Sequence, residues 1–409
     1  MHFAGAPGGR PCPKTRRQKG SMEPKLLHTR LIALVAGVAV AVCAIVGVTV
    51  AMPAQAESDL ATDYGYVYSG MKSQSVAFAK ASMTDESLLM FGSSEFSTPA
   101  SIVPQVPAAV FGGNDYGLRC MLVGEAYDQS LWHAIALGAY AQGGVPRGKV
   151  VLIVGPGWFV DGGMDAETFG TRFSYALYAG FCANNAVPAD VKAYVRNRLL
   201  QLGVDETQVA ANAGSLPQDV LNGAVFGAID DLKIRQGLVD VRGGGLPLVD
   251  EAVAAVPDFA SMREQALVDG AAMSTTNDWG VEDGFYTKRL EPALADAAGS
   301  RADETYSNTP EYDDFNCFLD IADACGIEVL VVIGPVMGPY YDLIGITAET
   351  RANCYDRIRA IAAEHPSVRL ADFSDREYEK YFLYDIVHFG TVGWTDVNQA
   401  VYDFAMKEG

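Results

Sequence analysis

Three residues of this 409-residue chain have the types and the order that nucleophilic acyl transfer requires. Ser94 stands in a Gly-Ser-Ser turn directly after a short apolar run, and Asp385 and His388 form an Asp-x-x-His pair far downstream. In such a set the histidine takes the hydroxyl proton, the carboxylate holds the imidazole in the correct tautomer, and the serine oxygen attacks a carbonyl carbon. The sequence therefore predicts a serine hydrolase or acyltransferase.

Each part of this set also has a purely structural interpretation. A serine in a turn after a strand can cap a helix, and an Asp-x-x-His pair can be a turn hydrogen bond. Two other histidines are better explained without catalysis. His133 lies within an apolar helical pattern and is predicted to be a packing residue, whereas His365 follows a helix and is expected to be exposed or to interact with the helix C-terminus.

Five short apolar runs are predicted to be the buried strands that position these residues. Each run ends at a turn signal such as Gly-Ser-Ser or Gly-Pro-Gly, and helical patterns separate several of them. This alternation predicts an α/β fold with a doubly wound, mostly parallel sheet, in which ligands bind beyond the C-terminal ends of the strands. The predicted strands are 88–91, 121–123, 150–154, 328–333 and 368–371.

The predicted helices carry recognisable start and stop signals. They cover 128–141, 310–325 and 348–364. In the first, Asp128 is expected to be the cap or to lie in the first turn. In the second, we expect Thr309 as the N-cap, Pro310 as the first helical residue and Gly326 as the stop.

Residues from about 163 to 309 interrupt the alternation of strands and helices. They are predicted to be mostly helical, at 188–202 and 218–235, with a glycine-rich turn at 242–245. We interpret this stretch as a helical insertion that covers the mouth of the site.

The N-terminal region has the charge order of a membrane anchor. Residues 1–30 carry seven Lys or Arg against a single acid and are predicted to be a basic cytoplasmic tail. Residues 31–52 contain no charged side chain, and as a helix they could cross a bilayer core of about 30 Å. The positive-inside rule then places residues 57–409 outside the cell. The Ala-Gln-Ala sequence at 54–56 leaves a cleaved signal peptide as the alternative.

The overall charge and the cysteines narrow the possible functions. A formal net charge of −20 argues against non-specific nucleic-acid binding. It would also repel an anionic polymer at long range, so such a substrate needs a local basic or metal-assisted site. The five cysteines after residue 57 allow at most two disulfides and a spare thiol, and they fit no zinc pattern. We expect most of them to be plain buried cysteines.

A serine followed by a late Asp-x-x-His resembles the SGNH hydrolases, and several segments resemble the DltD family more closely. The resemblance extends over about residues 25 to 409 and is weakest from 190 to 305. It implies an SGNH-like three-layer fold in which Ser94 is the nucleophile, His388 the base and Asp385 its orienter. The segments that carry it are 91–95, 129–134, 155–159, 171–174, 335–338, 341–342, 371–374 and 385–394.

The same resemblance implies an oxyanion hole formed by the backbone N–H groups of Ser94 and Gly124. The Gly-Gly-Asn-Asp sequence at 112–115 is similar to a block of the superfamily but precedes the second strand, so we interpret Asn114 as a turn residue. Gly157 stands where DltD-like sequences tend to have Gln, and it offers no side-chain donor. Met337 replaces a polar residue common in the family. The departure at Gly157 favours a transferase over a fast hydrolase.

The activity implied is transfer of D-alanine to lipoteichoic acid at the outer face of a bacterial cell membrane. The implied partners are a D-alanyl donor, a membrane-bound O-acyltransferase and the polymer acceptor, and no metal or cofactor is indicated. Gln129, Trp158 and Tyr341 are candidates for substrate binding, with core packing as the alternative for Trp158 and Tyr341. An envelope esterase or thioesterase, and a non-catalytic scaffold of the D-alanylation machinery, are the other hypotheses.

Overall fold

The computed structural model describes residues 24–51, 75–112, 116–210 and 255–407, together with isolated positions at 220, 224, 225, 228 and 232. The chain divides into two units, Met1–Ala51 and Met52–Gly409. The first contains helix α1 (Pro24–Ala51). Among the described residues, no helix combines the length and the apolar character needed to cross a membrane. The anchor expected at 31–52 therefore stays a prediction.

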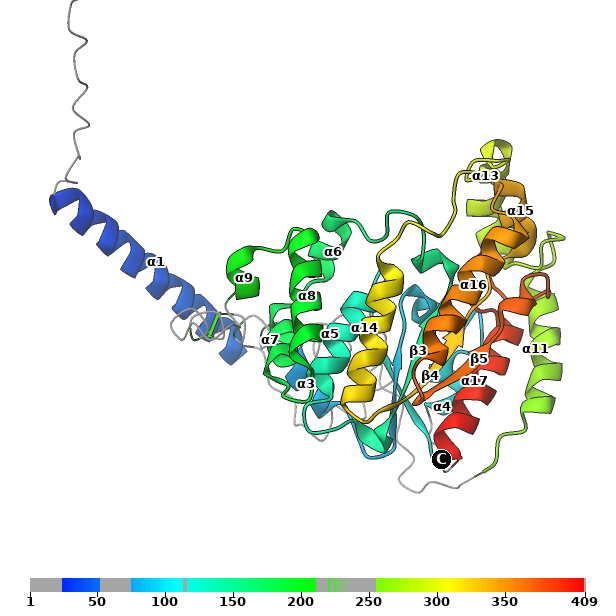
Figure 1. Ribbon diagram of the computed structural model, residues 1–409, viewed down its shortest axis with the longest axis horizontal. Coiled ribbons are helices and arrows are strands. Elements are labelled where there is room, and N and C mark those ends of the chain that lie inside the picture. Colours follow the sequence, from blue (N-terminus) through cyan, green and yellow to red (C-terminus); the bar gives the residue numbers. More distant parts are fainter. Residues whose placement is uncertain are drawn as a thin grey trace, which may run out of the picture. The chain divides into compact units, whose positions relative to one another are not determined.

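A five-stranded, all-parallel sheet is the centre of the second unit (Figure 1). The five predicted strands are confirmed, with ends that differ by no more than two residues, but the last of them is largely exposed instead of buried. In the strand order β2-β1-β3-β4-β5, β2 is added on one side of β1. The chain then crosses to the other side of β1, where β3, β4 and β5 follow in turn. The switch point, where ligands bind in such sheets, lies between β1 and β3. The strands are β1 (Ser87–Phe91), β2 (Arg119–Val123), β3 (Lys149–Val154), β4 (Glu328–Ile333) and β5 (Val368–Asp372).

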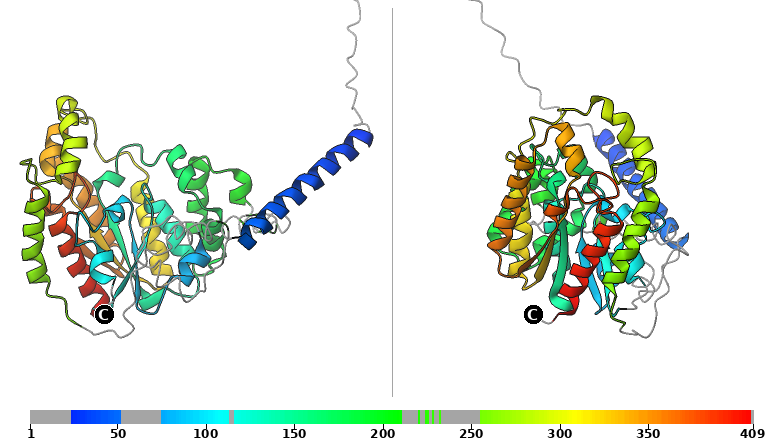
Figure 2. Two further views of the ribbon diagram at one scale, coloured as in Figure 1. Left: turned by 180° about the vertical axis from the view of Figure 1, so that it is seen from behind. Right: turned by 90° about the vertical axis from the view of Figure 1, so that its right-hand side faces the viewer.

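Both faces of the sheet are covered by helices. Alternate side chains of each strand point to opposite faces, so apolar strands present side chains on both faces that need to be buried. Leu89 and Phe91 of β1 join one hydrophobic core, and Leu88 and Met90 join the other. The views in Figures 1 and 2 show helices on either side of the sheet. The expected three-layer α/β architecture is therefore confirmed. The first core includes α5 (Ser130–Tyr140), α7 (Tyr175–Ala183), α14 (Glu311–Ala324) and α16 (Ala348–Ala363), and the second α4 (Pro107–Phe111), α11 (Phe259–Met273) and α17 (Thr391–Met406).

Two of the predicted helix caps are wrong. Helix α5 begins at Ser130, and Asp128 lies before it with its Oδ2 accepting the N–H of Glu125 at 2.6 Å, so a neighbouring loop takes the carboxylate. Helix α14 begins at Glu311 with Pro310 as its N-cap, one residue later than expected. Thr309 Oγ1 still accepts the N–H of Glu311 at 3.3 Å. Gly326, at φ 66°, ends this helix as predicted.

The described part of 163–309 contains helices and turns and no strand. Its longer helices thicken the two helical layers: α7 packs against α5, and α11 against α17. The helix expected at 218–235 lies outside the described residues apart from the isolated positions, and the turn at 242–245 lies wholly outside them. The helices of this stretch not yet given are α6 (Ala166–Arg172), α8 (Ala189–Gln201), α9 (Glu206–Ala210), α12 (Asp283–Phe285), a π-helical turn (Tyr286–Leu290) and α13 (Glu291–Ala293).

Short elements complete the described chain. Helices α3 (Val76–Ala81) and α15 (Gly338–Ile344) precede β1 and follow β4. Short 3-10 turns occur at Ser94–Ser97, Pro146–Gly148, Pro156–Trp158, Leu294–Asp296 and Ser374–Arg376. Two of them, at Ser94 and Pro156, directly follow the strands on either side of the switch point.

Six cysteines lie in the described part of the chain, and all are free thiols. Cys120, Cys317 and Cys354 are buried, as expected for plain core residues. His365 is not exposed, contrary to one of the two expectations. It is 7% exposed, with Nδ1 2.7 Å from Asp323 Oδ2 and Nε2 3.2 Å from Asn316 Oδ1. Both partners lie on α14, so the neighbouring helix rather than solvent surrounds this imidazole.

Candidate active site

Ser94 begins a 3-10 turn immediately after β1, at the end where parallel strands present their ligands. The residues before it are held tightly. Ser93 is buried and its Oγ donates to the carbonyl of Glu125 at 3.2 Å, in the loop after β2. A Cβ on Gly92 would lie 2.6 Å from the ring of Phe96, so a larger residue would force that ring to move. The turn therefore leaves Ser94, which is half-buried, as the hydroxyl offered to the cavity.

Asp385 gives its two carboxylate oxygens different tasks. Oδ1 accepts the backbone N–H groups of Val387 at 2.9 Å and His388 at 2.7 Å, which closes the Asp-x-x-His turn. Oδ2 lies 2.6 Å from Nδ1 of His388. Asp385 therefore closes the turn and also contacts the imidazole. Because Asp385 is only 5% exposed, water hardly competes for either contact.

His388 Nε2 lies 2.7 Å from Ser94 Oγ, which completes a serine, histidine and aspartate chain. With Nδ1–H donating to Asp385, the neutral imidazole presents a lone pair at Nε2 to the serine proton. Burial alone lowers the pKa of His388, but the hydrogen bond and charge of Asp385, with the charge of Glu95, outweigh it and raise the pKa above its usual value. The same groups would stabilise the imidazolium formed when Ser94 gives up its proton.

A cavity of about 200 Å³ surrounds Ser94 and His388. Its wall comes from the turns after β1, β3 and β4 and from the His388 loop, as expected for the C-terminal edge of the sheet. Gln129 and Trp158 also line it, whereas Gly124 and Tyr341 do not. None of the described residues between 163 and 309 lines it either, so the expected cover of its mouth stays a prediction.

Tyr341 and Trp158 differ in their surroundings. Tyr341 is 8% exposed on α15 and belongs to the hydrophobic core, which supports its packing interpretation. Trp158 is half-buried and faces the cavity. Its indole stacks on His133 with 5.2 Å between the ring centroids. Trp158 therefore remains a candidate for substrate contact, and Tyr341 does not reach the cavity.

His133 forms a hydrogen bond to the turn that carries Ser94. Its helical pattern in the sequence did not reveal this contact. It is fully buried, and Nε2 donates to the carbonyl of Gly92 at 2.9 Å. Burial lowers the pKa of His133 to about 3, so the imidazole stays neutral near pH 7. The expected packing role is correct, but the contact with Gly92, two residues before Ser94, links this histidine to the site.

Gly124 directly follows β2 and does not line the cavity. Its φ of 131° lies where L-residues are strained, and a Cβ there would be 1.9 Å from the carbonyl oxygen of Gly92. The exits of β2 and β1 therefore pack backbone against backbone. The oxyanion role of Gly124 and Ser94 stays a prediction.

The departures from the family pattern lie in different surroundings. Gly157 is exposed on the cavity wall, and no atom lies within 4 Å of the place a Cβ would occupy. Met337 is 5% exposed in the core, and its N–H donates to Ile386 O at 2.9 Å, in the loop that carries His388. Asn114 lies outside the described residues.

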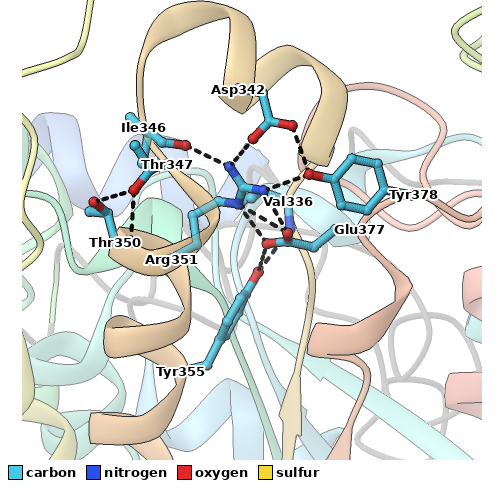
Figure 3. A network of polar contacts seen from close by, with 9 residues as sticks. All are labelled: Val336, Asp342, Ile346, Thr347, Thr350, Arg351, Tyr355, Glu377 and Tyr378. Carbon is cyan, nitrogen blue, oxygen red and sulfur yellow. Dashed lines mark hydrogen bonds and ion pairs between the residues drawn. The ribbon is translucent and has the colours of Figure 1, made fainter.

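A buried arginine, Arg351, is the centre of a polar network that includes Val336 of the cavity wall (Figure 3). Arg351 of α16 is fully buried and forms ion pairs at 2.8 Å with both Glu377 and Asp342. Tyr355 connects this network to the wall, since its hydroxyl donates to Glu377 at 3.0 Å and accepts the N–H of Val336 at 3.2 Å. This network was not predicted from the sequence. A charged residue on the face of α16 that also carries Cys354, Tyr355 and Ile358 was the available signal.

The site is free of metal ligand clusters as far as the described residues go: no group of three or more His, Cys, Asp or Glu side chains there could hold a metal ion.

Comparison with known proteins identifies the family of this chain. A family model described as DltD protein matches residues 65–406. Protein DltD of Bacillus subtilis (strain 168) is 27% identical over 331 residues, which cover 78% of this chain and 82% of that protein. Protein DltD of Lacticaseibacillus rhamnosus is 26% identical over 335 residues (79% and 78%), and that of Staphylococcus aureus (strain NCTC 8325 / PS 47) 24% over 318 residues (76% and 79%). Since the family model covers most of its length, the chain belongs to the DltD family.

Proposed function

We propose that this protein transfers D-alanine to lipoteichoic or another teichoic acid through an ester on Ser94. The observation that carries the proposal is the 2.7 Å contact between Ser94 Oγ and His388 Nε2, with Asp385 2.6 Å from the other ring nitrogen. Membership of the DltD family supports D-alanine as the acyl group and teichoic acid as the acceptor. The small cavity around the serine suits a short acyl unit.

The reaction has two acyl transfers with one base. Ser94 Oγ attacks the carbonyl carbon of an activated D-alanyl ester or thioester held by a membrane donor, and its proton moves to His388 Nε2. The bond from that carbon to the donor oxygen or sulfur breaks, and the leaving atom takes the proton from His388. A glycerol or ribitol hydroxyl of the polymer then attacks the Ser94 ester, gives its proton to His388, and releases Ser94, which regains a proton.

The negative oxygen formed in each step needs hydrogen-bond donors. The backbone N–H groups of Ser94 and Gly124 are our candidates, and one such donor is worth about 3–4 kcal/mol of transition-state stabilisation. Gly157 adds no side-chain donor, so attack by a polymer hydroxyl, positioned by its own binding, is favoured over attack by loose water.

The proposal also places the protein in the cell. Residues 31–52 would anchor it in a bacterial membrane with residues 1–30 inside, and the catalytic unit would work outside beside a membrane-bound O-acyltransferase. Carbonate extraction of membranes tests the anchor. The full chain should stay in the membrane pellet and a chain lacking residues 1–56 should not; release of the full chain would contradict the anchor.

Complementation of a strain that lacks this gene tests the reaction. Wild type should restore ester-linked D-alanine in the envelope, and Ser94→Ala and His388→Ala should not. Ser101→Ala, an exposed serine outside the cavity, is the matched control and should restore it fully. Equal restoration by wild type and Ser94→Ala would defeat the proposed mechanism.

A fluorophosphonate probe then separates the remaining hypotheses. Labelling of Ser94 in the detergent-solubilised full chain, without any D-alanine phenotype, would indicate an envelope esterase or thioesterase. Absence of labelling, combined with full complementation by Ser94→Ala, would indicate a scaffold.

A further inference from the structure

The wall of the Ser94 cavity carries few charged side chains. Among the described residues that line it there is no lysine or arginine, and Glu95 is the single carboxylate. Glu95 is 8% exposed and close enough to His388 for their charges to interact. Burial raises the pKa of Glu95, and a nearby cation would lower it again. Such a wall disfavours an anionic acyl group and suits a cationic one.

Two aromatic rings line the same cavity. Tyr127, in the loop between β2 and α5, has φ 72° and is 63% exposed as a residue. A bulky residue rarely adopts this conformation, and strain of about 1–3 kcal/mol of this kind gathers at functional sites. Trp158 lines the cavity from the turn after β3. The faces of both rings attract cations, tryptophan most strongly.

Gln129 provides the directional contact. It is the N-cap of α5, yet its side chain makes no capping hydrogen bond. Within the described chain its Oε1 is buried without a hydrogen-bond partner, although the residue lines the cavity. A buried acceptor without a donor destabilises a protein by about 1–3 kcal/mol. A ligand that donates an N–H to this oxygen would remove that penalty, which favours its binding.

We propose that Gln129, together with Tyr127 and Trp158 of the same cavity, forms a subsite for the ammonium group of an aminoacyl unit carried on Ser94. The inference rests on the proposed acyl transfer and names the feature of the acyl group that the cavity selects. In an α-aminoacyl ester the ammonium is bonded to the carbon next to the ester carbonyl, so its subsite must share one small cavity with the nucleophile. An ammonium offers three N–H donors and a compact charge, which match one amide oxygen and two aromatic faces.

The test compares two p-nitrophenyl esters that differ in the amino group alone, D-alanyl and propionyl. The second-order rate of p-nitrophenol release by the solubilised full chain is measured for both, and the alanyl-to-propionyl ratio is compared among variants, which cancels the intrinsic reactivity of the esters. Gln129→Leu should lower the ratio about tenfold or more, because a hydrogen bond to a charged group is lost. Gln129→Glu, which still accepts and adds a negative charge, should keep or raise it.

Gln399→Leu is the matched control, since Gln399 is exposed on α17 and does not line the cavity. It should leave the ratio at the wild-type value. A ratio unchanged in Gln129→Leu, or lowered equally in Gln129→Glu and Gln129→Leu, would overturn the ammonium subsite while leaving acyl transfer intact. If neither ester reacts faster with wild type than with Ser94→Ala, the proposed function itself fails, and the subsite with it.

Discussion

Replacing His133 by Gln tests whether a buried neutral imidazole holds the nucleophile turn. His133 is fully buried, its Nε2 donates to Gly92 O at 2.9 Å, and burial lowers its pKa to about 3. Its other nitrogen, Nδ1, has no partner in the described chain, as expected for the neutral ring. Gln offers a similar donor at the same reach but does not titrate.

The expected magnitude follows from proton binding by the unfolded chain. The folded pKa of His133 lies below the unfolded value of about 6.5, so the unfolded chain binds more protons and wild-type stability falls as the pH falls below 6.5. Between pH 7.5 and 5.5 this linkage lowers the free energy of unfolding by about 1.3 kcal/mol. The folded state contributes almost nothing in this window, because a pKa of about 3 lies well below it.

The assay is urea denaturation of wild type and His133→Gln at the two pH values, followed by fluorescence. Other groups titrate in both proteins alike, so the difference between them isolates His133. The free energy of unfolding of wild type minus that of His133→Gln should decrease by about 1.3 kcal/mol from pH 7.5 to pH 5.5. His133→Phe should show the same pH dependence and also lose fluorophosphonate labelling of Ser94, because no donor remains for Gly92. A difference that does not change with pH would refute the buried neutral state.

Four further predictions concern the site and its support. Asp385→Asn removes the contact that raises the pKa of His388, so the acid limb of Ser94 labelling against pH should move to lower pH while the maximal rate falls about 10³–10⁴-fold; an unmoved limb would contradict the assignment. Gly124→Ala places a Cβ 1.9 Å from a backbone oxygen at φ 131°, so it should lower stability by about 2–4 kcal/mol in urea denaturation, and a wild-type midpoint would show that we misjudge this turn. Gly157→Gln enters open space, so its stability should stay within about 0.5 kcal/mol of wild type while hydrolysis of the acylated serine, followed after a p-nitrophenyl ester burst, becomes faster; a slower hydrolysis would argue against a missing donor. Arg351→Met leaves the half-buried Glu377 without its cation, while the exposed Asp342 can turn to water, so it should lower stability by about 1–3 kcal/mol; a change below about 0.5 kcal/mol would mean that the network contributes little to stability.

Much of the fold could be predicted because its signals are local. Strands buried on both faces of a parallel sheet are nearly all apolar, so runs such as 150–154 and 328–333 stand out, and their observed ends differ little from the predicted ones. Helix starts were less certain. Whether Asp128 caps α5 depends on its bond to Glu125, and Thr309 was displaced as a cap when Pro310 took that position. Such competition among neighbouring acceptors is not encoded by residue type alone.

The candidate site also has a part that the sequence indicated and a part that depends on the tertiary structure. Residue types and order, by themselves, indicated Ser94, Asp385 and His388, because acyl transfer needs a hydroxyl, a base and a carboxylate whatever the fold. Only the tertiary structure decided that the serine and the histidine meet at 2.7 Å, that Tyr341 stays in the core, and that His133 lies beneath the nucleophile turn. The reason is physical: these contacts depend on the strand order β2-β1-β3-β4-β5, which differs from the order of the strands along the chain. Long-range packing sets that order, and no short stretch of sequence contains it.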